Sequence, residues 1–123
     1  MNVERAKLIS RAASIFEKND FAPASPGQFG ADDKPQVCAA LALAAAIVEK
    51  ESGSFQSGLD YAVKILSNTS KHEARRMILD VVGLYFRDGT GSQTMIFNDE
   101  QHPMRRKTAV LRFFRRWAQH SLV

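Results

Sequence analysis

The sequence predicts an all-α fold: a compact bundle of about five helices around an alanine-rich central helix, with little or no sheet. Apolar residues recur at helical spacing along most of the chain, and stretches rich in glycine or proline separate these periodic segments. Of the 123 residues, 45% are hydrophobic and 24% are charged, which is typical of a folded globular protein. A chain of this length can bury one core, so we expect a single helical domain over residues 1–123.

The first expected helix spans Val3 to Lys18, where the apolar residues fall on one face. The residues of that face are Ala6, Leu8, Ile9, Ala12, Ala13, Ile15 and Phe16. Residues 20–34 follow, with two prolines and two glycines, and predict a long loop. Loops of this length serve either as lids and binding loops or as plain connections, and both interpretations stay open.

A second helix is expected from the segment ADDKPQVCAALALAAAIVEKE. Asp32 or Asp33 can cap its amino end, and Pro35 suits the first turn, where a backbone N–H has no partner to lose. The run from Val37 to Val48 is apolar on every side and rich in alanine. Such a helix is expected at the centre of a bundle, where small side chains let neighbouring helices approach closely.

Two more helices are expected after the break at SGSF. The third repeats apolar residues along one face at Leu59, Ala62, Val63 and Leu66. The fourth opens at SKHE, Ser70 to Glu73, which has the form of a capping box, and it ends at RDGTGS. The stretch QTMIF could be extended, although a single short strand would have nothing to pair with.

The last helix is expected to begin near Pro103, because a proline further inside would cost a backbone hydrogen bond. Its apolar side chains share one face: Val110, Leu111, Phe113, Phe114, Trp117 and Ala118. The arginines share another: Arg105, Arg112, Arg115 and Arg116. We expect the aromatic face to belong to the core and the arginine face to be exposed.

The excess positive charge of the chain belongs to this last segment. Residues 1–97 contain 11 basic and 11 acidic residues, whereas residues 98–123 contain six basic and two acidic ones. The four arginines could bind phosphates or the acidic side chains of a partner, or they could simply solvate the surface. No known nucleic-acid-binding motif accompanies them, and the aromatics are expected on the wrong face to stack bases beside them.

The single cysteine, Cys38, is expected in the first turn of the second helix, where the helix dipole favours a thiolate. It could therefore be the nucleophile of a thiol-dependent enzyme, with Asn98, Asp99 or His102 as helpers. The simpler alternative is a small buried hydrophobe, with Asn98 and Asp99 as helix caps. No His or Cys pair has metal-ligand spacing, and DGTGS lacks the lysine of a phosphate-binding loop, so we expect no metal and no cofactor.

A soluble, cytoplasmic protein is expected from three features. A lone cysteine favours a reducing compartment, and the amino-terminal residues MNVERAKLIS do not have the pattern of a signal peptide. The longest apolar run has 12 residues, whereas a membrane-spanning helix needs roughly 20.

Three segments of the chain resemble a family of small uncharacterised proteins from bacteria and their phages. That family has R-A-A near the start, C-A-x-G-A-L in the middle, and an aromatic-N-D segment before a helix that contains V-L and a terminal alanine. The corresponding positions here are Arg11–Ala13, Cys38–Leu43, Phe97–Asp99, Val110 with Leu111, and Ala118. The resemblance implies a small domain and directs attention to Cys38, Asn98 and Asp99, but it implies no activity.

From the sequence we therefore expect a non-enzymatic binding or adaptor module. Its basic C-terminal helix would contact an anionic partner, either nucleic acid or an acidic protein surface, through Arg105, Arg112, Arg115 and Arg116. The alternative is a thiol-dependent enzyme with Cys38 as the nucleophile. An aromatic edge of the last helix could also form a homodimer.

Overall fold

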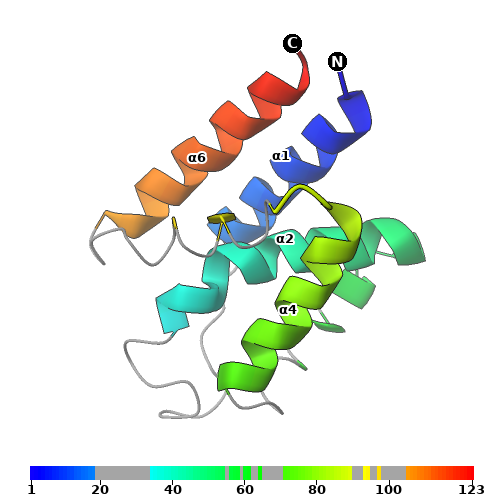
Figure 1. Ribbon diagram of the computed structural model, residues 1–123, viewed down its shortest axis with the longest axis vertical. Helices are drawn as coiled ribbons and strands as arrows, with labels where there is room; N and C mark the ends of the chain where they lie inside the picture. Colours follow the sequence, from blue (N-terminus) through cyan, green and yellow to red (C-terminus); the bar gives the residue numbers. More distant parts are fainter. Residues whose placement is uncertain are drawn as a thin grey trace.

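The computed structural model describes residues 1–18, 34–54, 56–58, 60, 61, 64, 71–89, 93, 94, 97 and 105–123. At 34–38, 71, 72, 74, 75, 106 and 107 it describes the backbone alone. Its main helices are α1 (Val3–Lys18), α2 (Lys34–Ser52), α4 (Lys71–Tyr85) and α6 (Arg106–Ser121), as Figure 1 shows. Shorter helical stretches lie between α2 and α4 and between α4 and α6, and no strand occurs in the described ranges. The all-α prediction is confirmed.

The bounds of the helices agree closely with the sequence pattern at three of the four helices. α1 has the predicted bounds, Pro35 lies in the first turn of α2, and α4 begins directly after Ser70, the predicted capping serine. α6 begins at Arg106 rather than near Pro103, with Arg105 as an N-cap that makes no side-chain capping bond. Of the predicted loop 20–34, the described part is Lys34, which is the first residue of α2.

The interpretation of QTMIF as an extended segment is wrong at each of its described residues, because Gln93, Thr94 and Phe97 are helical. The chain turns at Gly89, whose positive φ of 82° suits a residue without a Cβ. The backbone N–H of Gln93 then donates to the carbonyl oxygen of Gly89 at 3.2 Å. Thr94 is buried, so this short helical stretch packs against the rest of the protein. An isolated strand here would have had no partner for its backbone hydrogen bonds.

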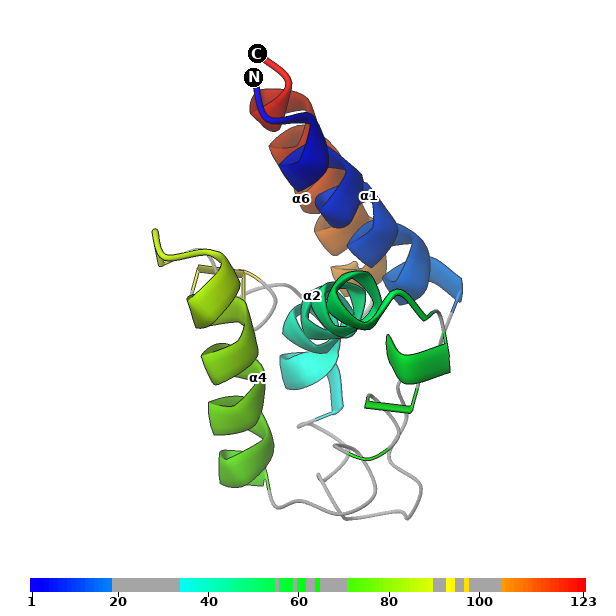
Figure 2. The same cartoon turned by 90° about the vertical axis from the view of Figure 1, so that its right-hand side faces the viewer.

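Helix α2 lies at the centre of the described helices, between the α1–α6 pair and α4 (Figure 2). α1 and α6 run side by side in opposite directions, with both chain ends at the same end of the pair (Figure 1). The backbone N–H of Asn2 donates to the carbonyl oxygen of Ser121. The Asn2 side chain accepts from the backbone N–H of Arg5 at 3.0 Å, as an N-cap of α1 should.

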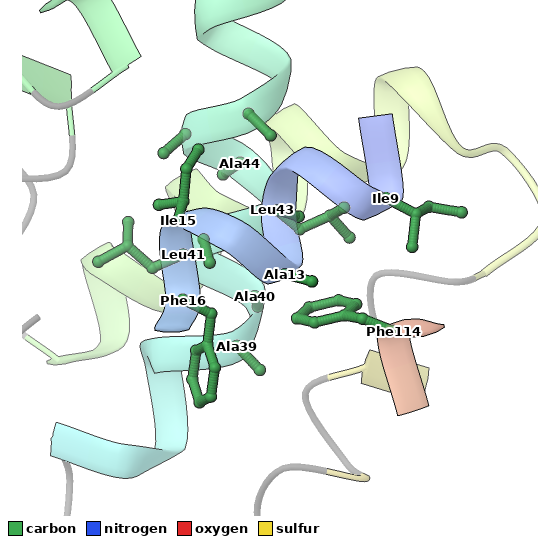
Figure 3. Close-up of a cluster of buried hydrophobic side chains, with 14 of the residues drawn as sticks. Ile9, Ala13, Ile15, Phe16, Ala39, Ala40, Leu41, Leu43, Ala44 and Phe114 are labelled. Carbon is green, nitrogen blue, oxygen red and sulfur yellow. The ribbon is translucent and has the colours of Figure 1, made fainter. Parts of the chain in front are cut away.

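The core is built around the alanine-rich part of α2, as predicted. Every residue from Ala39 to Ile47 is at most 1% exposed, so this helix has no solvent face over more than two turns. Phe16 of α1 meets Phe114 of α6 edge to face beside Ala39 and Ala40, with ring centroids 6.4 Å apart (Figure 3).

Small residues also allow a close approach on another side of α2. A Cβ placed on Gly58 would lie 2.7 Å from the backbone oxygen of Ala45. The helical stretch that contains Gly58 therefore packs backbone to backbone against α2, which a larger residue at this position would prevent.

Polar contacts fasten α2 to its neighbours at its carboxyl end. The Nε of Arg11 on α1 lies 3.1 Å from both carboxylate oxygens of Glu49. Lys50 donates to the Tyr85 hydroxyl of α4 at 2.9 Å and lies 3.5 Å from the carboxylate of Glu4. The hydrogen bond to Tyr85, opposed by some burial, raises the pKa of Lys50 above its usual value. These contacts give Arg11, the first residue of the R-A-A segment, a structural role.

No helix in the described ranges is both long enough and apolar enough to cross a membrane.

Candidate functional site

Helix α6 is enclosed on one side and open on the other. Its innermost residues are Val110, Leu111, Phe114 and Ala118, all buried. The four arginines that the sequence singled out are all exposed: Arg105, Arg112, Arg115 and Arg116. The division into a core face and a cationic face is therefore confirmed at these eight positions.

Phe113 and Trp117 differ from the other apolar residues of α6, because they are only half-buried. They lie at the boundary between the two faces and line a groove of about 610 Å³ beside α6. From α6 the groove is lined by Ala109, Arg112, Phe113, Arg116, Trp117 and His120. From elsewhere in the chain it is lined by Arg5, Asp88, Gln93 and Phe97. The site is thus assembled from α1, α6 and the segment after α4.

An aromatic cluster forms one wall of this groove. Phe97 stacks on Phe113 with ring centroids 4.6 Å apart and planes 19° apart. The ring of Trp117 lies 6.0 Å from that of Phe113 and 5.1 Å from that of Phe86. Packing among rings fixes these side chains, so the groove is preformed along this wall.

The expectation that the aromatics are on the wrong face for the arginines is wrong for Phe113 and Trp117. Arg112 and Phe113, like Arg116 and Trp117, are adjacent in sequence and about 100° apart around the helix, so both kinds of side chain reach the same groove. The arrangement of side chains therefore allows a base to stack on a ring beside an arginine.

Arg5 brings a cation from α1 into the groove. Its guanidinium forms an ion pair with Asp88 at 2.7 Å and lies over the rings of Phe86 and Trp117, at 4.8 and 5.5 Å from their centroids. Ion pairing and cation–π contacts hold this side chain against the aromatic wall. Arg5 also neutralises Asp88, the single acidic residue among the described lining residues.

Arg112 and Arg116 differ from Arg5, because neither has an ion-pair partner within the described part of the chain. They are one helical turn apart on the same side of α6. Like charges at this spacing destabilise a helix by about 0.2–0.5 kcal/mol. An anion bound between them would remove that repulsion and satisfy guanidinium N–H groups that now face solvent.

The structure divides the four predicted binding residues into two pairs. Arg112 and Arg116 line the groove, whereas Arg105 and Arg115 are exposed outside its lining. Sequence analysis missed Arg5 and His120 as members of this site. Nothing in the pattern of the first helix distinguishes Arg5 from an ordinary solvated residue, because its role follows from the antiparallel pairing of α1 with α6.

A second hollow, between α1 and α2, has a different electrostatic character. Its volume is about 430 Å³, and its charged lining residues are Glu4, Lys7, Arg11, Glu49 and Lys50. Four of them form ion pairs with one another, Arg11 with Glu49 and Lys50 with Glu4. These two pairs leave Lys7 as the one cation of the lining without an acidic partner among the described residues, so this hollow has a smaller surplus of positive charge than the groove beside α6.

The side chains of the thiol-enzyme hypothesis all lie outside the described part of the chain, so this hypothesis stays a prediction. Asn98, Asp99 and His102 lie outside it, and Cys38 is described by its backbone alone. The expected position of Cys38 in the first turn is wrong, because α2 begins at Lys34 and Cys38 is its fifth residue. The effect of the helix dipole declines beyond the first turn.

No group of three potential metal ligands occurs among the residues that the structure describes.

No family model matches the chain, and no curated protein or solved structure shows significant similarity to it. The resemblance to small bacterial and phage proteins therefore stays a prediction, and the function has to be argued from the groove itself.

Proposed function

We propose that the protein is a binding module that holds an anionic partner in the groove beside α6. The observation that carries this proposal is the pair Arg112 and Arg116, which line the groove and have no ion-pair partner among the described residues. Arginine binds carboxylates and phosphates through two parallel N–H donors, and two arginines one turn apart can bind one anion or two successive ones.

The balance of charge in the groove supports the same proposal. The described lining carries three arginines against one aspartate, and Arg5 already neutralises that aspartate. The field of the remaining guanidinium groups extends into a concave space, which concentrates anions there more strongly than on a convex surface. His120 adds a further nitrogen donor at the carboxyl end of the same wall.

Two double variants of equal charge test this function. Arg112→Gln with Arg116→Gln removes two charges from the groove, and Arg105→Gln with Arg115→Gln removes two from the same helix outside it. We expect the groove variant to bind labelled polyanions at least tenfold more weakly, about 1.4 kcal/mol. The control variant should stay within about threefold of the wild type at about 0.1–0.15 M salt, because its two arginines lie outside the groove lining and are partly screened from it.

The probes for this test are inorganic polyphosphate, polyglutamate and oligonucleotides, measured by fluorescence anisotropy. Binding of the wild type should weaken roughly tenfold between about 50 and 200 mM salt if two to three contacts are made. Equal losses in both double variants would show a diffuse charge effect and overturn the groove as the site. Absence of binding to every polyanion at low salt would overturn the function altogether.

A further inference from the structure

We infer that the anion is single-stranded nucleic acid, which lies along α6 with its phosphates on one row of side chains and its bases against another. The cation row is Arg112, Arg116 and His120, and the aromatic row is Phe113 and Trp117. This inference rests on the proposed function and specifies the class of partner. It depends on the two rows lying next to each other in one groove.

The spacing of the two rows matches the repeat of a nucleic-acid strand. Residues four apart on a helix are separated by about 6 Å along its axis. Arg112, Arg116 and His120 therefore present a cation or nitrogen donor at intervals close to the separation of successive phosphates in an extended single strand. Phe113 and Trp117 have the same interval, so the first two steps along α6 each offer one group for a phosphate and one ring for a base, and His120 adds a third group for a phosphate.

The aromatic row is the feature that should make the groove prefer a single strand to other polyanions. Phe113 and Trp117 are half-buried and line the groove, so a base would stack on the parts of the two rings that Phe97 and Arg5 do not cover. Base stacking on aromatic side chains beside a positively charged groove is the usual way in which proteins bind single strands. In a duplex the bases are already stacked on one another, and an acidic peptide gains little from a phenyl or indole surface.

The dimensions and internal contacts of the groove suit such an occupant. Its volume of about 610 Å³ lies within the range of about 300–1,000 Å³ in which small-molecule-sized groups are bound. Arg5 holds Asp88 in an ion pair at 2.7 Å, so this carboxylate does not repel a phosphate as an unpaired one would. Phe97 stacks on one face of Phe113 and itself lines the groove, so it extends the aromatic row.

Trp117 is the single tryptophan of the chain, so its intrinsic fluorescence reports on this site alone. We would titrate the full chain at low salt with an oligothymidine of about ten nucleotides, a length within the site sizes of single-strand-binding folds. Stacking of a base should quench the fluorescence of Trp117. A duplex of similar length, inorganic polyphosphate and polyglutamate would be titrated in parallel.

The single strand should bind at least tenfold more tightly than the duplex or polyphosphate at equal phosphate concentration, because the latter two lack accessible bases. Equal binding of polyphosphate would overturn this inference and leave the anion-binding function intact. Tighter binding of polyglutamate would overturn it in favour of an acidic protein partner. If none of the four probes binds, the proposed function fails together with it.

A matched pair of variants separates stacking from charge. With a labelled oligonucleotide, Phe113→Leu should weaken single-strand binding about tenfold while leaving polyphosphate binding within twofold. The Arg112→Gln and Arg116→Gln double variant should weaken both. Equal loss of both ligands in Phe113→Leu would show that the ring only supports the fold and would overturn the stacking role. The comparison of probes on the unaltered chain needs no variant and decides the question independently.

Discussion

Helices α2 and α6 are of similar length, 19 and 16 residues, and their surroundings differ completely. From Ala39 to Ile47, α2 is enclosed on every side. α6 buries only one side, with Phe114 at its centre, and presents arginines on the other. The difference teaches that an enclosed helix has no surface left for a partner, whereas a helix at the boundary of the core can hold a site without disturbing the packing.

The largest expected effect comes from the inner side of α6. Phe114→Ala removes a fully buried ring that contacts Phe16, and it should lower the free energy of unfolding by about 3–5 kcal/mol. Arg115→Ala, at the adjacent exposed position, should change it by no more than about 0.5 kcal/mol. Urea denaturation measures both. Similar losses at the two positions would contradict the division of α6 into a core side and a solvent side.

An intermediate effect is expected on α2. Ala42→Leu adds three carbon atoms at a position with 0% exposure and should destabilise the fold by about 1–3 kcal/mol through overpacking. Glu51→Leu introduces the same side chain at an exposed position of the same helix and should cost no more than about 0.5 kcal/mol. A tolerated Ala42→Leu would mean that α2 has free space around it.

The smallest expected effect tests whether a buried hydroxyl group near α2 has a hydrogen-bond partner. The hydroxyl oxygen of Tyr61, one turn beyond Gly58, is buried and has no hydrogen-bond partner in the described part of the chain. Tyr61→Phe should therefore stabilise the fold by about 1 kcal/mol at neutral pH. Chemical denaturation of both proteins measures the difference. A less stable variant would show that the hydroxyl has a partner after all.

The same variant has a pH dependence of known sign. Burial, and to a lesser degree Asp80, raises the pKa of Tyr61 above its usual value of 10.0. Above pH 10 the unfolded chain loses the phenolic proton first, so stability falls as the pH rises. Lys50 also has a raised pKa, and its contribution is lost above pH 10.5. Tyr61→Phe should therefore reduce the fall in the free energy of unfolding above pH 10. The part of that fall that comes from Lys50 should remain.

Much of the fold could be predicted from helical periodicity. The bounds of α1 and the enclosure of α2 follow from which residues are apolar and how they repeat. Periodicity could not predict the start of α6, because Arg105 gives it no side-chain cap to recognise. It also could not predict that Gln93, Thr94 and Phe97 are helical, because so short a segment has no repeat.

The site could be predicted only in part, for a related reason. The pattern of one helix identifies its polar face, and so Arg112 and Arg116 were found. It does not identify which other helix lies beside that face, so it cannot indicate Arg5 or separate Arg112 and Arg116, which line the groove, from Arg105 and Arg115. The helical pattern divides the residues of α6 into a buried face and an exposed face. Phe113 and Trp117 belong to neither, because they are half-buried and line a groove to which Phe97 also contributes.

The pairing of α1 with α6 has a consequence for biosynthesis. The groove joins Arg5 of α1 to residues of α6 that lie far along the chain, and α6 leaves the ribosome after α1, α2 and α4. Until then the nascent chain lacks Phe114, and the apolar residues of α1 that α6 covers remain uncovered. The lining of the groove is therefore complete only after α6 has been synthesised, and contacts between helices so far apart in sequence form more slowly than local ones.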